Sequence, residues 1–302
     1  MSTSHTGAAQ AGTEPLEDGR TVETLSGSPS LATTFVKAVV TGFGKSGGGD
    51  LPQTALELAV SVDRDHLATY QQVCGWDVSD VLPHTYPHVL GFPLQATLMA
   101  RSDFPLPLAG LVHIENTITV HRKLTADDAL TITVHAERKR PHAKGTVVDL
   151  VTEVDSAGER VWEGRSTYLA RGRSNPEAEV SRGPDLPVGA PAARWSLPEG
   201  LGRTYASVSG DVNPIHLHLL TAKALGFPRA IAHGMWTYAR VLAALGPVAS
   251  GPSTTSQVWF RKPVLLPSRV ELVVDKSGDP IVAGLRAAKK PEVEHLVLTL
   301  EH

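Results

Sequence analysis

Apolar and polar residues alternate in two separate groups of segments along the chain, as expected for half-buried β-strands. The first group comprises residues 111–120, 129–137, 145–155 and 160–170, and the second comprises residues 257–260, 269–274, 281–287 and 294–300. Each group follows an apolar stretch without a wide polar face, GFPLQATLMA (91–100) or HGMWTYARVLAAL (233–245). Strands joined by short loops pair antiparallel, so we expect an antiparallel sheet wrapped around each of these helices, an α+β fold.

The two groups belong to an internal repeat. YQQVCGW (70–76) matches YASVSGD (205–211) at Tyr, Val and Gly with identical spacing. VHRKLTADDALTITV (120–134) also aligns with FRKPVLLPSRVELVV (260–274) without a gap, and each reads as strand end, loop and strand. Both halves of the chain therefore share one plan, and we expect their sheets to be continuous.

Composition sets the boundaries of the halves. Residues 1–28 are rich in Ser, Thr, Gly, Ala and Glu, which predicts disorder, and a short amphipathic helix is expected within 29–43. Residues 174–191 contain four prolines and no apolar periodicity, which predicts a linker. The expected organisation is a disordered N-terminus with a short helix (1–49), a first half (50–173), the linker (174–191) and a second half (192–302).

Charge and cysteine content exclude several classes of protein. The net charge of −3 gives no basic field for nucleic acid, so no nucleic-acid partner is expected. Cys74 is the only cysteine, which rules out an internal disulfide and fits a reducing cytoplasm. The polar N-terminus lacks the apolar core of a signal peptide or spanning helix, so we expect a cytoplasmic protein without a membrane partner.

The stretch SVSGDVNPIH (207–216), followed by AHGM (232–235), carries the candidate chemistry. Asp-x-Asn-Pro alone is an ordinary turn. Together, these residues resemble the signature of the MaoC-like, or type 2 (R)-specific, enoyl-thioester hydratases and 3-hydroxyacyl-thioester dehydratases, whose fold is the hot dog. With TYPHVLGFPLQ and LVHIENTIT in the first half, the chain resembles the double-hot-dog dehydratases over about residues 50–302.

The resemblance implies a role for each matching residue. Asp211 and His216 correspond to the catalytic aspartate and histidine, and Asn213 to the asparagine of the turn. Gly234 corresponds to the glycine whose backbone N–H faces the thioester oxygen. The first half departs from the pattern because Trp76 stands where the aspartate would be, so one active site per chain is implied.

These residue types suit hydration of an enoyl thioester, which needs a base, an acid and stabilisation of charge on the carbonyl oxygen. His216 can take a proton from water and a desolvated Asp211 can exchange one with Cα, although the sequence leaves open which does which. Asn213 can hold the water or a partner side chain. Gly234 at a helix start allows close approach to a free N–H, and the helix dipole favours negative charge there.

Other polar residues have simpler interpretations. We expect His233 to bond inward at the start of its helix and His218 to be exposed. We expect one satisfied structural network on a first-half strand, formed by His113, Glu115 and Asn116.

Five residues are weaker substrate-binding candidates. Trp76 and Phe92 could line a substrate channel, although core packing is the favoured interpretation. Three cations could meet the phosphates of coenzyme A or a carrier protein, although such side chains are usually just solvated: Arg229, Arg261 and Lys262.

The leading hypothesis is an (R)-specific hydro-lyase that interconverts trans-2-enoyl and (R)-3-hydroxyacyl thioesters of coenzyme A or acyl carrier protein. The alternatives are a hot-dog thioester hydrolase and a non-catalytic acyl-thioester-binding protein. Neither apolar helix contains Asp or Glu, which counts against hydrolysis, and the intact Asp211 and His216 count against a binding protein. No metal or organic cofactor is expected, since no metal-ligand cluster is visible in the sequence. The expected assembly is a monomer or a homodimer.

Overall fold

The computed structural model describes residues 19–302 except residues 32, 35–44 and 46. Most of the short helix expected within 29–43 lies outside the described residues. The expected disorder of residues 1–28 is wrong for residues 21–24, which form strand β1 (Thr21–Thr24) and pair in parallel with β2 (Thr54–Val60). Val22 of β1 is buried, so even a short polar segment can be ordered when it adds to the edge of a sheet.

The remaining elements follow the two-half plan predicted from the sequence. In the first half, β2 is followed by α2 (Arg64–Cys74), α3 (Tyr86–Met99), the short 3-10 helix η1 (Leu108–Gly110), β3 (Leu111–Val120), β4 (Leu130–His142), β5 (Gly145–Ser156) and β6 (Glu159–Arg171). In the second half, the order is β7 (Ala193–Leu197), α4 (Leu201–Ser209), α5 (Pro214–Leu217), α6 (Leu219–Ala224), α7 (Gly234–Leu245), η2 (Gly246–Ser250), β8 (Thr254–Phe260), β9 (Ser268–Asp275), β10 (Ile281–Ala287) and β11 (Lys290–Glu301).

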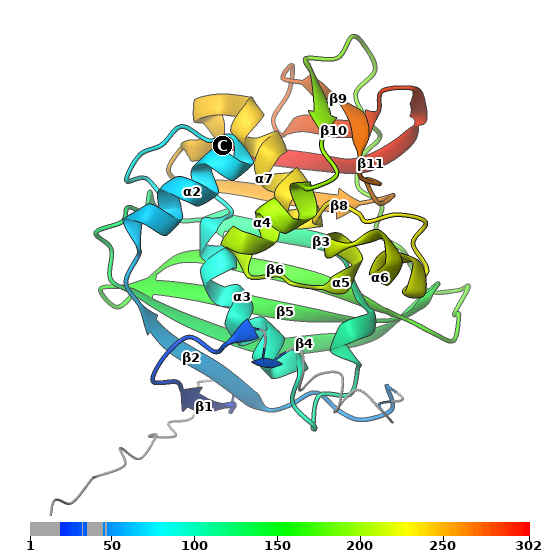
Figure 1. The fold of residues 1–302 in the computed structure, drawn as a ribbon. Coiled ribbons are helices and arrows are strands. Elements are labelled where there is room, and N and C mark those ends of the chain that lie inside the picture. Colours follow the sequence, from blue (N-terminus) through cyan, green and yellow to red (C-terminus); the bar gives the residue numbers. More distant parts are fainter. Residues whose placement is uncertain (1–18, 32, 35–44, 46) are drawn as a thin grey trace, which may run out of the picture.

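All of the named strands form one sheet, in the order β1-β2-β4-β5-β6-β3-β8-β11-β10-β9-β7. The long helices lie against one face of it, with α3 in front of the first-half strands and α7 beside the second-half strands (Figure 1). The predicted double hot dog with a continuous sheet is therefore confirmed. Among the described residues, no helix combines the length and apolar character needed to cross a bilayer.

The sequence repeat is also a structural symmetry. The gapless alignment pairs residues 140 positions apart, such as Val120 with Phe260. Continued by three residues, it makes Gln257 the counterpart of Thr117, and these two residues face each other where β3 pairs antiparallel with β8. A pseudo-two-fold axis therefore passes through the centre of the sheet and exchanges the two halves.

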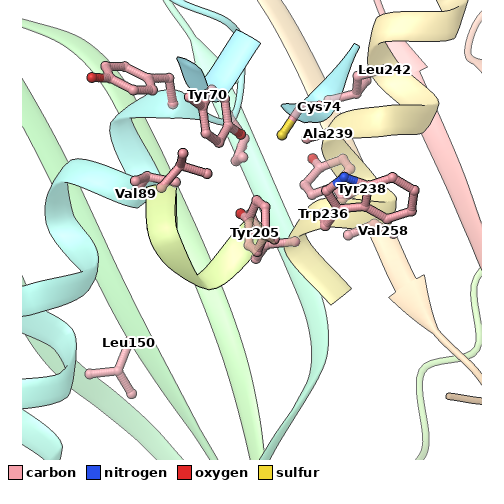
Figure 2. Close-up of a cluster of buried hydrophobic side chains, with 14 of the residues drawn as sticks. Tyr70, Cys74, Val89, Leu150, Tyr205, Trp236, Tyr238, Ala239, Leu242 and Val258 are labelled. Atoms are coloured by element: carbon pink, nitrogen blue, oxygen red, sulfur yellow. The ribbon is translucent and has the colours of Figure 1, made fainter. Parts of the chain in front are cut away.

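Hydrogen bonds of aromatic side chains connect the helices of the two halves. The His66 imidazole of α2 lies 2.8 Å from both the Tyr86 hydroxyl and the Val208 carbonyl oxygen of α4. The Trp236 indole of α7 donates to the Val73 carbonyl at 2.9 Å. Figure 2 shows Trp236 in the same buried cluster as Tyr205. These contacts fix α4 and α7, the two helices that carry the candidate site, against the first half.

Candidate active site

A tight turn after α4 positions the candidate acid and base. Helix α4 ends at Gly210, whose left-handed conformation (φ 69°) reverses the chain. The Asp211 carboxylate then accepts from the Asn213 N–H at 3.1 Å. The Asn213 side-chain oxygen accepts from the Ile215 N–H at 3.4 Å, so Asn213 caps the short helix α5. The turn is self-bonded as in an ordinary Asp-x-Asn-Pro turn, and this bonding holds Asp211 beside His216.

Two backbone contacts fix His216. The Ile231 N–H donates to the Ile215 carbonyl at 3.1 Å, which ties α5 to the segment before α7. On the other side, α4 approaches so closely that a Cβ on Gly202 would lie 1.9 Å from the His216 carbonyl oxygen. Gly202 therefore permits a contact between α4 and α5 that no larger residue would allow.

The hydrogen bonding of His216 selects one tautomer. Its Nδ1 lies 2.9 Å from the Ile231 carbonyl oxygen. A carbonyl can only accept, so Nδ1 carries the proton in the neutral ring and Nε2 keeps a free lone pair. Nε2 has no hydrogen-bond partner among the described residues, and His216 lines a large cavity. This nitrogen is thus available to take a proton from a bound molecule.

His233 supports both groups from behind. Its Nε2 lies 2.9 Å from the Asp211 backbone oxygen and 3.8 Å from the Asp211 carboxylate. Its ring stacks on His216, with 3.7 Å between centroids. The sequence-based expectation that His233 bonds inward is confirmed, and we regard it as a positioning residue.

Burial shifts both candidate catalytic groups toward their neutral forms. It raises the pKa of the Asp211 carboxyl, against smaller opposite effects of the His216 imidazole and the Asn213 N–H, although a quarter (25 %) of the side chain still faces the cavity. It lowers the pKa of His216, against the opposing effect of the Asp211 charge. Burial and the neighbouring His216 hold the pKa of His233 well below its usual value.

Helix α7 presents an uncapped N-terminus next to these groups. Its N-cap residue, His233, makes no side-chain capping bond, and Gly234 lines the cavity. A Cβ on Gly234 would lie 3.1 Å from the Phe260 ring. Gly234 thus places the start of α7 at a confined part of the cavity, where the helix dipole favours a negative oxygen.

The side chains of Asp211, His216 and His233 also have donor atoms that all lie within 4.8 Å of one another, a set able to hold a metal ion. The sequence analysis expected no such cluster, and this expectation is wrong as a statement about geometry. The third member was missed because His233 lies 17 residues beyond His216 and is brought back by the Ile215–Ile231 contact.

The cavity has a volume of about 1260 Å³, above the usual range for small-ligand pockets. Both halves line it. Its walls include Asp211, His216, Asn213 and Gly234 together with Phe92, Arg261 and Lys262 of the weaker candidates. Such a volume suits an extended ligand rather than a compact one.

Two of the proposed substrate-binding residues do not belong to this site. The half-buried Trp76 packs against the core outside the cavity, and its indole N–H has no hydrogen-bond partner among the described residues. Arg229 lies outside the cavity as well and donates to the Pro267 carbonyl at 3.3 Å. Of the two cations that do line it, Arg261 is already bonded to Glu294 and to two linker carbonyls.

The remaining polar predictions also have clear outcomes. His218 is exposed, and its Nδ1 accepts from the Leu220 N–H at the start of α6. Asn116 donates to Ser166 at 2.9 Å and contacts His113 at 3.4 Å, and Glu115 accepts from Gln257 at 2.6 Å. The expected network is therefore present, but it is not fully satisfied, because the side-chain oxygen of Asn116 has no partner among the described residues. His113 and Glu115 nevertheless line the cavity.

The linker also contributes to the cavity, which its composition did not predict. Residues 174–191, all of them described, contain no helix or strand, but many of them from Asn175 to Asp185 line the cavity. The Trp259 indole donates to the Ser181 hydroxyl at 2.5 Å and helps to hold this segment against β8. Proline-rich composition predicts only irregular structure, so no local signal marked the linker as a cavity wall.

The first half lacks the machinery because it lacks the loop that carries it. Equivalent isolated bridges, Val81 with Thr125 and Ile231 with Leu265, show that Val81 corresponds to Ile231. Six positions separate Gly75 from Val81, whereas twenty-one separate the corresponding Gly210 from Ile231. The counterpart of Gly234 is His84. Its imidazole is buried and forms a hydrogen bond of 2.6 Å with the Ser256 hydroxyl.

Comparison with known proteins shows consistent similarities. Residues 176–297 match the MaoC-like domain family, and residues 68–163 match the FAS1-like dehydratase domain region. The chain is 39% identical over 218 residues to 3-hydroxyacyl-thioester dehydratase X of Mycobacterium tuberculosis, covering 70% of this chain and 76% of that protein. A crystal structure of that organism's HtdX superposes with a TM-score of 0.72 at 34% identity, covering 82% of this chain and 98% of the other. An acyl-ACP thioesterase of Bacteroides thetaiotaomicron shares the fold alone, with a TM-score of 0.52 and 11% identity over 82% of this chain and 97% of the other.

Proposed function

Because the chain belongs to the MaoC-like dehydratase family, we propose that it interconverts trans-2-enoyl and (R)-3-hydroxyacyl thioesters as a hydro-lyase. One observation carries the proposal. The partner-free Nε2 of His216 and the carboxyl of Asp211 meet in one cavity beside the uncapped start of α7.

Hydration then proceeds with each group in a definite role. A water molecule held between Asp211 and His216 loses a proton to Nε2 of His216 as its oxygen bonds to C3. The electrons of the C2–C3 double bond move toward the thioester carbonyl, whose oxygen gains negative charge at the Gly234 N–H. Asp211, favoured in its protonated form by burial, delivers a proton to C2.

Dehydration runs through the same steps in reverse. Ionised Asp211 removes the proton from C2, and His216, now protonated, delivers a proton to the departing hydroxyl. His233 keeps both groups in place through its contact with the Asp211 backbone and its stacking on His216. Each turnover leaves Asp211 and His216 in exchanged protonation states, so a proton passes between them, directly or through a water molecule, before the next turnover in the same direction.

The substrate is an acyl thioester of coenzyme A or acyl carrier protein. A cavity of about 1260 Å³ is large enough for both a pantetheine arm and an acyl chain. Lys262 is a candidate contact for the phosphates of the carrier, whereas Arg261 is occupied by its own bonds. One chain contains both halves and one complete site, so either a monomer or a homodimer is compatible with catalysis, and we propose a cytoplasmic location.

The alternative of thioester hydrolysis has less support. The described central helices, α3 and α7, carry no Asp or Glu that could attack or activate water at the thioester carbon. The described site carries an acid and a base suited to proton transfer instead. A purely binding role does not explain why an acid and a base lie together in the cavity.

The test is turnover of crotonyl-, octenoyl- and hexadecenoyl-CoA, followed by loss of enoyl absorbance, with free thiol measured in parallel. We expect absorbance to fall without thiol release for at least one chain length. Thiol release at the same rate would establish hydrolysis, and the absence of any change with all three substrates and their carrier-protein counterparts would refute the proposal.

A further inference from the structure

A buried imidazole lines the cavity on its first-half side. His88, in the first turn of α3, lines the cavity and is only 4 % exposed. Neither of its ring nitrogens has a hydrogen-bond partner among the described residues. The first-half wall of the cavity combines apolar residues such as Val89, Phe92 and Met99 with polar ones such as His113 and Tyr168.

A chain of ring contacts connects His88 with the start of α7, where the reacting end of the ligand would lie. The Phe260 ring lies beside Gly234, and the His113 ring follows, 5.3 Å from Phe260 between centroids. The His88 ring in turn stacks on the His113 ring, with 6.0 Å between centroids. A thioester oxygen at Gly234 would thus leave His88 some distance along the cavity, past Phe260 and His113.

His113 already has partners within the protein. Its Nε2 lies 3.4 Å from the Asn116 side-chain nitrogen, so it is the acceptor of that bond, and its ring also stacks on Tyr168 at 4.6 Å. His113 therefore serves as a fixed wall that orients His88 and leaves His88 as the free hydrogen-bonding group.

The symmetry of the fold emphasises that His88 is unusual. Its counterpart in the second half is Tyr238, whose hydroxyl is bonded to the Ser256 side chain at 2.5 Å. A buried polar group without a partner is unfavourable, and an acyl-chain wall would be served better by an apolar residue. The retained imidazole is explained if a ligand supplies the missing partner.

We propose that His88 binds a neutral oxygen function, a hydroxyl or a ketone, on the acyl chain beyond the reacting carbons. The preferred substrates are accordingly enoyl thioesters with a second, remote oxygen substituent. Burial lowers the pKa of His88 to about 4, so the ring is neutral at physiological pH and offers one donor and one acceptor, which matches a hydroxyl group. This inference rests on the proposed function, because it names the substrate class for the same site.

The test compares trans-2-decenoyl-CoA with isomers that bear one hydroxyl at successive carbons from C5 to the chain end. For at least one isomer, we expect wild-type kcat/KM to be about tenfold or more above that of the unsubstituted substrate, as for a ligand that satisfies a buried polar group. In His88→Leu this ratio should fall to near one, whereas His88→Gln, which keeps hydrogen-bonding groups, should retain part of it. His121→Gln, a partly exposed histidine outside the cavity, is the matched control and should keep the wild-type ratio.

A wild-type enzyme that prefers none of the isomers overturns the inference, and so does an unchanged preference in His88→Leu. Binding of saturated hydroxydecanoyl- and decanoyl-CoA, measured by calorimetry, tests the subsite without catalysis. Equal affinities contradict the inference even if hydration is rapid. A clear preference for one hydroxylated ligand without any turnover supports the subsite and contradicts the proposed function instead.

Discussion

The Nδ1 atom of His216 lies 2.9 Å from the carbonyl oxygen of Ile231, and this contact determines which nitrogen of the ring is free for chemistry. Ile231 is also the residue that bridges to Leu265 just before α7 begins. The same short segment therefore sets the tautomer of His216 and the position of Gly234. The base and the oxyanion donor are held by one rigid connection, which keeps their separation fixed.

Replacing Asp211 by Asn, or His216 by Gln, removes one proton-transfer group and largely preserves the shape of the turn. Each change should lower kcat by roughly 10² to 10⁴, the range that general acid-base catalysis supplies. The double variant should lose little more than the worse single variant, because the two groups act on one substrate as a unit. Steady-state kinetics and thermal melting check this prediction, and the melting temperature should hardly change. A single variant with near-normal turnover of every enoyl thioester would falsify it.

Gly234→Ala should impair catalysis by crowding rather than by unfolding. The added methyl group would lie 3.1 Å from the Phe260 ring and narrow the site at the Gly234 N–H. We expect kcat to fall by about tenfold or more, a part of the cost of losing one oxyanion donor. Stability should hold, since alanine favours helix. The double variant Gly234→Ala/Phe260→Leu restores space and should recover activity, and an equally low kcat there would contradict the mechanism of crowding.

Gly202→Ala tests whether the contact between α4 and α5 positions His216. A Cβ at this position would overlap the His216 carbonyl oxygen, which belongs to backbone and cannot rotate away. The free energy of unfolding should fall by about 1 to 3 kcal/mol, as for overpacking elsewhere, and kcat should fall in the folded fraction. Gly278→Ala, where a Cβ meets nothing within 4 Å, is the matched control. Urea titration and kinetics distinguish the two variants, and equal behaviour would contradict the prediction.

Trp76→Phe should leave turnover within a few-fold of the wild type, because Trp76 lies outside the cavity in the half that lacks the catalytic loop. The change also removes a buried N–H that has no partner among the described residues, so stability should be unchanged or slightly higher. Enoyl hydration and thermal melting provide the readout. A thousandfold loss in a folded variant would show that the first half takes part in catalysis.

The fold and the core of the site were predictable because their signals are local or repeated. Strand alternation and the match between 120–134 and 260–274 were sufficient for the double hot dog, and one turn carries Asp211, Asn213 and His216. The repeat aligns Trp76 with Asp211, and the favoured interpretation of Trp76, core packing, agrees with its place against the core. Alignment says nothing about the following loop, which is fifteen residues shorter in the first half.

The unpredicted parts depend on long-range packing. His88 looks like any polar residue at a helix start, and only the folded chain shows that it faces a cavity without a partner. The linker lines the same cavity because Trp259 of β8 and Arg261 just after it bond to Ser181 and Arg182, contacts across 78 and 79 positions of sequence. Neither feature leaves a pattern in the spacing of nearby residues.

His84 should contribute to acid sensitivity, because it is 4 % exposed and bonded to Ser256 between the two halves. Burial lowers its pKa to about 4, whereas an unfolded histidine titrates near 6.5. Between these values the unfolded state binds more protons, so the stabilising contribution is complete above about pH 6.5 and is lost as the pH falls toward 4. For such a shift, linkage gives a loss of about 2 kcal/mol in the free energy of unfolding between pH 7 and pH 5.

Urea titrations at both pH values should show a smaller decrease in the free energy of unfolding for His84→Gln than for the wild type, by about this amount. His121→Gln, at a partly exposed site, should follow the wild type, and an identical pH dependence in His84→Gln would locate the acid-sensitive group elsewhere.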